Sequence, residues 1–363
     1  MVLTDVIVVG GGIAGLSLAA ALAPHHRVVL LEREPRLFTH TSGRSAQQSQ
    51  PTYGPAPIRR FTATTLRLLD AMPDPLVTPR PLLWLDLDGA PPRLDDLLLE
   101  IEGLRRVSVA DAVEAFPALL ADRVAGAALD PASVEVDLYT LRDRLQASAE
   151  SHGCRFVLGE AMVAAERQDG DWVVTTDRET YRARTVVIAA GPWADDAATL
   201  IAQRRFGLVP TRRTVVVGAV HGESVDPRAP MLMDTAFTFY LRPSGDQILA
   251  SSLEDEPSVA EDSQPRPEVI DRTLEVVNSV TRLGVGAPYR SWTGLRTLSS
   301  DGLPVIGWDD DHAGLYWLVG QGGYGIQTSL GLAEAVAAEI AGVELPPQTA
   351  ADLAAFAPGR FTA

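Results

Sequence analysis

The chain has 363 residues, of which 46% are hydrophobic and 21% are charged, and this composition excludes a disordered or fibrous protein. A single core rarely grows beyond about 250 to 300 residues, so the length predicts two structural units. A formal net charge of -16 excludes the clustered basic surface that a nucleic-acid partner requires.

The cysteine, histidine and hydropathy patterns exclude further classes. Cys154 is the only cysteine, which rules out an intrachain disulfide and a cysteine-based metal cluster, and the cytoplasm is the expected location. The histidines show no metal-ligand spacing, so we expect no metal. No apolar run approaches the roughly 20 residues that span a bilayer, and we expect neither a signal peptide nor a membrane span.

The N-terminal residues predict a βαβ unit, with strands over 5–9 and 28–32 and a helix over 13–23. Directly after the first strand, Gly10, Gly12 and Gly15 form a GxGxxG motif. Such a turn lets the backbone approach a pyrophosphate, to which the helix N-terminus then donates hydrogen bonds. Glu32 ends the second strand, where its carboxylate can accept hydrogen bonds from ribose hydroxyls. This combination predicts dinucleotide binding, and the alternative is a tight turn without a ligand.

The rest of the chain mixes parallel and antiparallel signals. Residues 39–58 carry glycine, proline and polar side chains and are expected to be irregular, and residues 254–267 are expected to form a surface loop. A strand, a glycine loop and a helix return near the C-terminus, over 315–319, 320–325 and 328–341. Alternating runs predict an antiparallel sheet over 82–88, 214–220, 238–241 and 247–251, and two further strands are predicted over 172–176 and 185–191, the second ending in glycine.

These elements predict an α/β protein: a Rossmann-like domain with a parallel sheet, and an α+β substrate domain built on an antiparallel sheet. A nicotinamide dehydrogenase would continue with more βα units of one sheet, so the pattern favours FAD held in an extended pose. The expected cofactor domain comprises residues 1–80, 130–205 and 291–363, and the substrate domain comprises 81–129 and 206–290.

The whole chain resembles the family of FAD-dependent D-amino acid dehydrogenases and oxidases, which has glycine and sarcosine oxidases as relatives, and its pattern is most similar to that of D-arginine dehydrogenase. The first matching block, Val8 to Gly15, is shared by many flavoproteins, whereas the last two blocks are specific to the family. The matching segments are Val8 to Gly15, His40 to Ala46, Asp130-Pro131 with Asp137, Ala189 to Trp193, Trp292 to Arg296, and Gln321 to Thr328.

The resemblance implies non-covalently bound FAD. Arg44 and Ser45 would lie along the pyrophosphate and isoalloxazine, and Gly322 and Gly323 would precede a helix whose N-terminal amides face the flavin. The expected cofactor-binding residues are Gly10, Gly12, Ile13, Ala14, Gly15, Glu32, Arg33, Gly43, Arg44, Ser45, Ala46, Gln48, Met162, Ala190, Gly191, Trp193, Arg296, Gly322, Gly323, Tyr324, Gly325, Ile326 and Gln327.

A substrate carboxylate needs a guanidinium, which binds it through two parallel hydrogen bonds. Arg296 lies in the block that resembles the family's substrate-anchoring arginine and is the first choice, whereas Arg213, next to Arg212, is the second. Tyr53 and Tyr240 lie where the family places tyrosines that contact the carboxylate or close the pocket. Surface salt bridges for the arginines and core packing for the tyrosines are the alternatives.

Two positions depart from D-arginine dehydrogenase. Gln48 stands where that enzyme has a histidine near the substrate, and Leu82 aligns with its guanidinium-binding glutamate. A cationic side chain would then lack its countercharge, so we expect a neutral or apolar D-amino acid. The alternative for Leu82 is a plain sheet-core residue.

The resemblance implies hydride transfer from Cα of the neutral amine to flavin N5, followed by hydrolysis of the imine to a 2-oxo acid and ammonia. Carbonyl groups near Gly323 would accept from the amine. Three alternatives stay open: oxidation of a secondary amine such as sarcosine or an opine, an NAD(P)H-linked flavoprotein, and a non-catalytic flavoprotein. The electron acceptor, oxygen or a quinone-like molecule, cannot be read from the residues.

Overall fold

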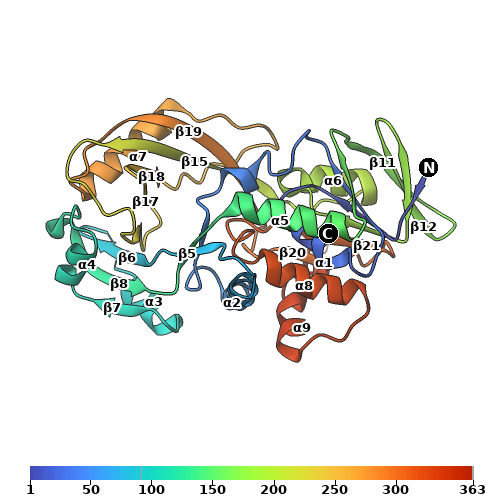
Figure 1. Ribbon diagram of the computed structural model, residues 1–363, viewed down its shortest axis with the longest axis horizontal. Helices are drawn as coiled ribbons and strands as arrows, with labels where there is room; N and C mark the ends of the chain where they lie inside the picture. Colours follow the sequence, from blue (N-terminus) through green and yellow to red (C-terminus); the bar gives the residue numbers. More distant parts are fainter. Residues whose placement is uncertain (91, 362–363) are drawn as a thin grey trace.

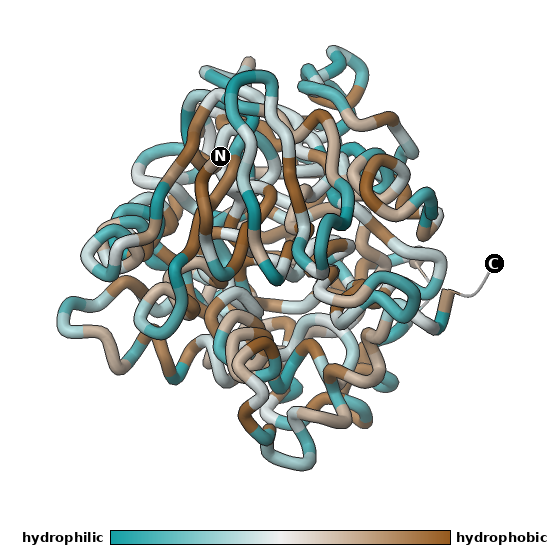
Figure 2. The backbone as a smooth tube through the Cα atoms, turned by 90° about the vertical axis from the view of Figure 1, so that its right-hand side faces the viewer, coloured by the Kyte–Doolittle hydropathy of each residue, from teal (hydrophilic) through white to brown (hydrophobic). Residues whose placement is uncertain are grey.

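The computed structural model describes residues 1–90 and 92–361. Figure 1 shows two groups of elements side by side, with a parallel sheet and its helices in one and a large, mainly antiparallel sheet in the other. In Figure 2 the hydrophobic stretches follow interior strands, and many of the outer turns are hydrophilic. The predicted fold class is therefore confirmed.

A six-stranded sheet forms the centre of the first group. All its neighbouring strands are parallel except β20 and β21, which are antiparallel. Alternation explains its burial on both faces, because Val6 and Val8 of β2 point into one hydrophobic cluster while Ile7 and Val9 point into another. The strand order is β10 (Arg155–Leu158), β3 (Val28–Glu32), β2 (Val6–Val9), β14 (Thr185–Ile188), β21 (Leu315–Val319) and β20 (Val305–Trp308).

Helices cover one face of this sheet and a small sheet covers the other. The first face packs against α1 (Ile13–Leu22), α2 (Ala56–Asp70), α5 (Leu138–Ser151), α8 (Ser329–Ile340) and α9 (Pro347–Ala354). The second face packs against α6 (Ala194–Ala202) and a four-stranded sheet. That sheet has the order β1 (Val2–Leu3), β13 (Thr180–Ala183), β12 (Asp171–Thr176) and β11 (Met162–Gln168).

An eight-stranded sheet forms the second group. Its strands pair antiparallel except β16 and β6, which are parallel, so the expected antiparallel sheet has one parallel pair. Leu83 and Leu85 of β6 face one cluster, and Leu82 and Trp84 face another, which buries the strand on both sides. The order is β19 (Val285–Leu298), β15 (Val209–Val220), β18 (Gln247–Ser251), β17 (Tyr240–Ser244), β16 (Met231–Asp234), β6 (Leu82–Leu87), β8 (Val124–Asp130) and β7 (Arg105–Val107).

Short elements complete the fold. Helices α4 and α7 pack on the Leu83 face of the eight-stranded sheet, and α3 packs on the Leu82 face. A three-stranded sheet is built from short strands that are far apart in the sequence, and its neighbouring strands pair antiparallel. The helices are α3 (Leu94–Glu100), α4 (Val109–Ala115) and α7 (Pro267–Val280), and the small sheet has the order β4 (Gln48–Ser49), β9 (Val134–Val136) and β5 (Val77–Pro79).

Two of three sequence expectations need correction. Residues 39–58 are not wholly irregular, because they contain a 3-10 turn (Thr41–Arg44), strand β4 and the start of α2. The expected domain boundary at 291 cuts through β19, which pairs with β15 up to Leu298, so residues 291–298 lie in the eight-stranded sheet. Residues 254–267 agree with the expected surface loop, because they contain no helix or strand before α7 begins at Pro267 and most of them are exposed. Glu254, however, is only 5% exposed and accepts a hydrogen bond from Thr214 at 2.9 Å.

Within the described ranges, no helix combines the length and the apolar character needed to cross a membrane.

The buried carboxylate of Asp195 joins α6 to the chain that leads into β15. It accepts hydrogen bonds from the backbone N–H groups of Phe206 (2.9 Å) and Leu208 (3.1 Å). We expect Asp195→Ala to lower the free energy of unfolding by about 2–4 kcal/mol, because it leaves two buried donors without acceptors. Asp196 is exposed, so Asp196→Ala is the control and should change stability by less than about 0.5 kcal/mol. Equal effects of the two substitutions in urea unfolding would contradict this account.

Candidate functional site

Two adjoining cavities lie where the glycine turn meets the eight-stranded sheet. The first, the glycine-turn cavity, has a volume of about 320 Å³, and its lining includes Val9, Glu32, Trp193 and Leu200. The second, the arginine cavity, has a volume of about 500 Å³ and contains Arg213 and Arg296. The residues that line both are Gly12, Thr41, Ser42, Ala189, Gly191 and Pro192.

The glycine turn is shaped by close backbone approach. Gly10 has φ of 115°, and a Cβ there would lie 2.3 Å from the carbonyl oxygen of Ala189. A Cβ on Gly15 would lie 2.0 Å from the carbonyl oxygen of Gly10. Helix α1 has no acidic residue in its first turn, and the N–H of Ile13 donates to Ser42 Oγ at 2.9 Å. The positive end of its dipole can therefore face an anion such as a pyrophosphate.

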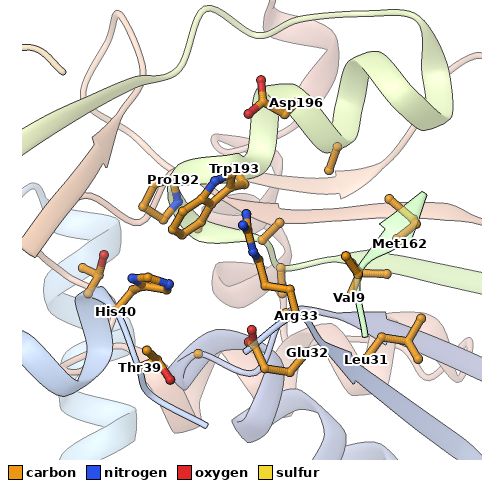
Figure 3. A pocket seen from close by; sticks show the side chains of 18 of the residues that line it. Val9, Leu31, Glu32, Arg33, Thr39, His40, Met162, Pro192, Trp193 and Asp196 are labelled. Carbon is orange, nitrogen blue, oxygen red and sulfur yellow. The ribbon is translucent and has the colours of Figure 1, made fainter. Parts of the chain in front are cut away.

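Glu32 stands at the carboxyl end of β3, in the wall of the glycine-turn cavity (Figure 3). Its carboxylate accepts hydrogen bonds from the N–H of Gly11 at 2.6 Å and of Glu34 at 2.8 Å. Burial is the main reason that the pKa of Glu32 is raised above its ordinary value, and the two backbone donors oppose that rise. The carboxylate thus orders the turn, and its remaining lone pairs can accept from ribose hydroxyls.

A cluster of aromatic and cationic side chains forms another part of the wall of this cavity. The Arg33 guanidinium lies 4.7 Å from the Trp193 ring centre, and the His40 ring lies 4.6 Å from the same ring (Figure 3). His40 Nε2 is 3.0 Å from Glu34 Oε1. Sequence reasoning assigned His40 no role, although it begins the polar stretch that resembles the family; here it forms part of the cavity wall.

Most of the expected cofactor residues line one cavity or the other. Gly15 and Gly43 line neither, and each instead allows a close backbone contact, since a Cβ on Gly43 would lie 2.1 Å from Phe38 O. In the glycine-turn cavity are Gly10, Gly12, Glu32, Arg33, Met162, Ala190, Gly191 and Trp193. In the arginine cavity are Gly12, Ile13, Ala14, Arg44, Ser45, Ala46, Gln48, Gly191, Arg296, Gly322, Gly323, Tyr324, Gly325, Ile326 and Gln327.

The charge of Arg44 is directed toward protein groups. Its guanidinium donates to the carbonyl oxygen of Thr293 at 2.9 Å and forms an ion pair with Asp262. We expected this guanidinium to donate to the cofactor. In the structure it instead ties the polar loop to β19, and the carbonyl of Arg44 accepts from Trp292 Nε1 at 2.8 Å.

Arg213 and Arg296 lie on neighbouring strands and share one face. Arg213 pairs in register with Gly294, two residues before Arg296, so the two side chains are diagonal neighbours on the sheet. Arg212 points to the opposite face, where it contacts Glu261 and Ser263. Burial, together with the positive charge of Arg296, lowers the pKa of Arg213 to about 10. Arg213, the second choice from the sequence, therefore lines the cavity, and strand alternation explains why its neighbour Arg212 does not.

Few protein groups compensate these two charges. Within the described residues, Arg213 forms one ion pair, with Asp255 at 3.6 Å, and Arg296 forms none. The guanidinium of Arg296 contacts Gly323, because a Cβ there would lie 3.0 Å from its Cζ and Nη1. The pair is therefore suited to an anion that enters from outside, above all a carboxylate.

Three tyrosines surround the same space. The Tyr53 ring lies 5.2 Å from Tyr324 and 6.1 Å from Phe237, and all three line the cavity with Tyr240. Burial raises the pKa of Tyr324 to about 12, and burial also raises the pKa of Tyr240. The hydroxyls of Tyr324 and Tyr240 therefore stay protonated near neutral pH and can donate hydrogen bonds.

Gln48 lines the arginine cavity mainly as part of its wall. Its amide nitrogen donates to the carbonyl oxygen of Arg80 at 2.9 Å, and its amide oxygen is enclosed without a partner. Leu82 is fully buried in the sheet core and does not line the cavity, as expected from the alternative in which it is a plain sheet-core residue. The apolar wall consists instead of residues that the sequence did not single out, on β15, on β16 and on the segments that follow β16 and β18: Val215, Met231, Met233, Ala236, Phe237 and Leu253.

Among the described residues, no group of histidine, cysteine, aspartate or glutamate side chains could hold a metal ion.

Comparison with known proteins gives one family match. Residues 5–339 match the family model described as DAO, FAD dependent oxidoreductase. Glycine oxidase of Geobacillus kaustophilus is 28% identical over 90% of this chain and 89% of that enzyme, and its crystal structure superposes with a TM-score of 0.84 over 98% of both chains. D-amino acid dehydrogenase of Rhizobium johnstonii is 28% identical over 64% of this chain and 55% of that enzyme. L-proline dehydrogenase from P. horikoshii has a TM-score of 0.86 at 16% identity, over 99% of this chain and 98% of that chain.

Trp193 offers a test of the glycine-turn cavity. We expect Trp193→Ala to weaken binding of FAD to the apoprotein about tenfold, because the ring and its stacked partners form one wall. Trp193→Phe keeps an aromatic surface and should stay within about threefold of the wild type. Titration of FAD into apoprotein, followed by flavin fluorescence, gives both constants. If the alanine variant bound FAD as tightly as the phenylalanine variant, the cavity would not hold the nucleotide.

Proposed function

Because the chain belongs to the DAO family of FAD-dependent oxidoreductases, we propose that it oxidises the amine of a neutral or apolar D-amino acid. The Cα–H and N–H bonds lose two electrons and two protons to give an imine, and water converts the imine to a 2-oxo acid and ammonia. FAD, when bound, supplies the two-electron acceptor. The D configuration is supported by the likeness to D-amino acid dehydrogenase.

The observation that carries this proposal is the pair of guanidiniums in the arginine cavity. Arg213 is largely buried and Arg296 has no ionic partner in the described chain, so a carboxylate would bring the charge that both lack. A planar carboxylate can accept two parallel hydrogen bonds from one guanidinium. Tyr240, fully enclosed beside them, can add a neutral donor.

The remaining residues fit an apolar substrate side chain and an extended cofactor. Met231, Met233 and Phe237 offer the side chain an apolar surface, and this wall supports the substrate class better than Leu82 does. The glycine cradle, the α1 N-terminus and Glu32 would hold the nucleotide portion, and the two adjoining cavities give FAD room to extend toward Gly323.

The protonation state of the substrate amine depends on which side-chain bases line the arginine cavity. Within the described residues, no histidine, lysine or glutamate lines the arginine cavity, and its one acidic side chain, Asp255, is largely exposed and paired with Arg213. A substrate amine would therefore enter unprotonated, with backbone carbonyls near Gly323 accepting from it, and turnover would rise with pH as the free ammonium loses its proton.

A secondary amine is the second candidate. The match to glycine oxidase spans most of both chains, so a small amine substrate deserves a direct comparison. Steady-state rates with D-alanine and N-methylglycine separate the two, because N-methylglycine needs room for a methyl group on the amine.

Anaerobic titration with a panel of amino acids tests the proposed activity. We expect D-leucine and D-methionine to bleach the bound flavin, and D-arginine to do so with at least tenfold lower efficiency, because the apolar wall cannot solvate the guanidinium of the substrate. The bleaching is followed by visible absorbance. Flavin that no amine reduces would indicate a non-catalytic protein, and a preference for D-arginine over D-leucine would contradict the proposed substrate class.

Replacement of Arg296 tests the carboxylate anchor. We expect Arg296→Met to raise KM for the amino acid about 100-fold, since it removes a charge-assisted pair of hydrogen bonds. Arg290 lies on the same strand, is exposed and lines neither cavity, so Arg290→Met is the control and should leave KM unchanged. Steady-state kinetics of both variants at saturating acceptor provide the comparison. A normal KM in the Arg296 variant would show that the carboxylate binds elsewhere.

A further inference from the structure

One carboxylate lies in the lining of a cavity built around two arginines. Among the described residues that line the arginine cavity, Asp255 is the single acidic side chain. Its Oδ1 lies 3.6 Å from Nη2 of Arg213, close enough for an ion pair and too far for a hydrogen bond. The donors of Arg213 therefore stay free for a better acceptor.

The two partners of this ion pair differ sharply in exposure. The Arg213 side chain is 12% exposed, whereas the Asp255 side chain is 72% exposed. A side chain that lines a cavity and is also largely exposed lies at the rim of that cavity. Ion pairs with an exposed partner contribute little free energy, so the carboxylate of Asp255 can leave Arg213 at small cost.

The backbone around Asp255 is held in place, so its side chain is the part that can move. Asp255 belongs to a segment of residues 252–266, here called the strap, which connects β18 to α7. Before it, the buried Glu254 accepts from Thr214 Oγ1 at 2.9 Å. After it, the carbonyl oxygen of Glu256 accepts from the N–H of Arg212 at 2.9 Å, and the N–H of Ser258 donates to Pro210 O at 2.7 Å.

We propose that Asp255 is a resident counter-ion of Arg213, which the substrate carboxylate displaces on binding. This rests on the proposed function, because it takes Arg213 to be a carboxylate anchor. In the empty cavity Asp255 partly compensates a buried charge, and it competes with every carboxylate that enters. It also disfavours substrates with a second carboxylate, because an acidic side chain would meet like charge at the rim.

Calorimetric titration of the FAD-loaded enzyme with isovalerate tests this idea. Isovalerate carries a carboxylate and a branched apolar chain but no amine, so an effect of Asp255 on an ammonium group cannot contribute. We expect Asp255→Asn to lower the Kd for isovalerate about two- to fivefold, the size of an exposed ion pair. Glu256 lies next to it on the strap, pairs with Arg266 and does not line the cavity, so Glu256→Gln makes the same change in net charge as a control.

The outcomes separate the two proposals. If the wild type binds no isovalerate, the carboxylate anchor and with it the proposed function fail. If the wild type binds isovalerate and Asp255→Asn leaves the Kd unchanged or raises it, the counter-ion role alone is overturned. An equal gain in Glu256→Gln would also overturn it, because the effect would then reflect net charge rather than contact with Arg213.

Discussion

The arginine cavity is arranged around the positive charges of Arg213 and Arg296. Among the described residues, a protein carboxylate compensates these charges only at the rim. Burying a guanidinium is costly unless a counter-charge accompanies it. The register of β15 and β19 nevertheless places both side chains on one face, with a single exposed carboxylate nearby. A fold that accepts this cost is suited to receive a carboxylate from outside.

The same strand that carries Arg296 also aligns the two cavities. Thr41 Oγ1 donates to the carbonyl oxygen of Leu295 at 2.7 Å, and the Arg44 guanidinium bonds to the carbonyl oxygen of Thr293. The polar loop after the βαβ unit is thus fixed to β19 by hydrogen bonds. A nucleotide at the N-terminus of α1 and a carboxylate at Arg296, as proposed, would therefore be positioned by one connected set of contacts.

The sequence predicts the local parts of this arrangement well. The βαβ unit is confirmed almost to the residue, because a buried strand, the glycines and the end of the next strand are signalled by neighbours in the chain. The strands at Gln247–Ser251 and Leu315–Val319 agree as well. Membership of a family of FAD-dependent oxidoreductases, expected from the glycine turn and the C-terminal glycine loop, is also confirmed.

Long-range pairing explains what the sequence did not predict. Arg44 is neutralised by Asp262, more than two hundred residues away, so no spacing rule could show that its charge is taken. Arg213 was the second choice from the sequence, and its position in the cavity follows from which face of β15 meets the cavity. The apolar wall was not predicted, because it comes from β15, β16 and the segments after β16 and β18. Leu82 is a sheet-core residue, and the side chains that line the arginine cavity are those of Met231 and Met233 instead.

A crystal structure of the FAD-loaded enzyme with a bound apolar amino acid or its amine-free analogue would test the central claim most directly. We expect the ligand carboxylate to lie between the guanidiniums of Arg296 and Arg213, with Asp255 turned away and the apolar chain against Met231 and Met233. A carboxylate bound elsewhere, or Arg296 turned toward bulk solvent, would contradict it.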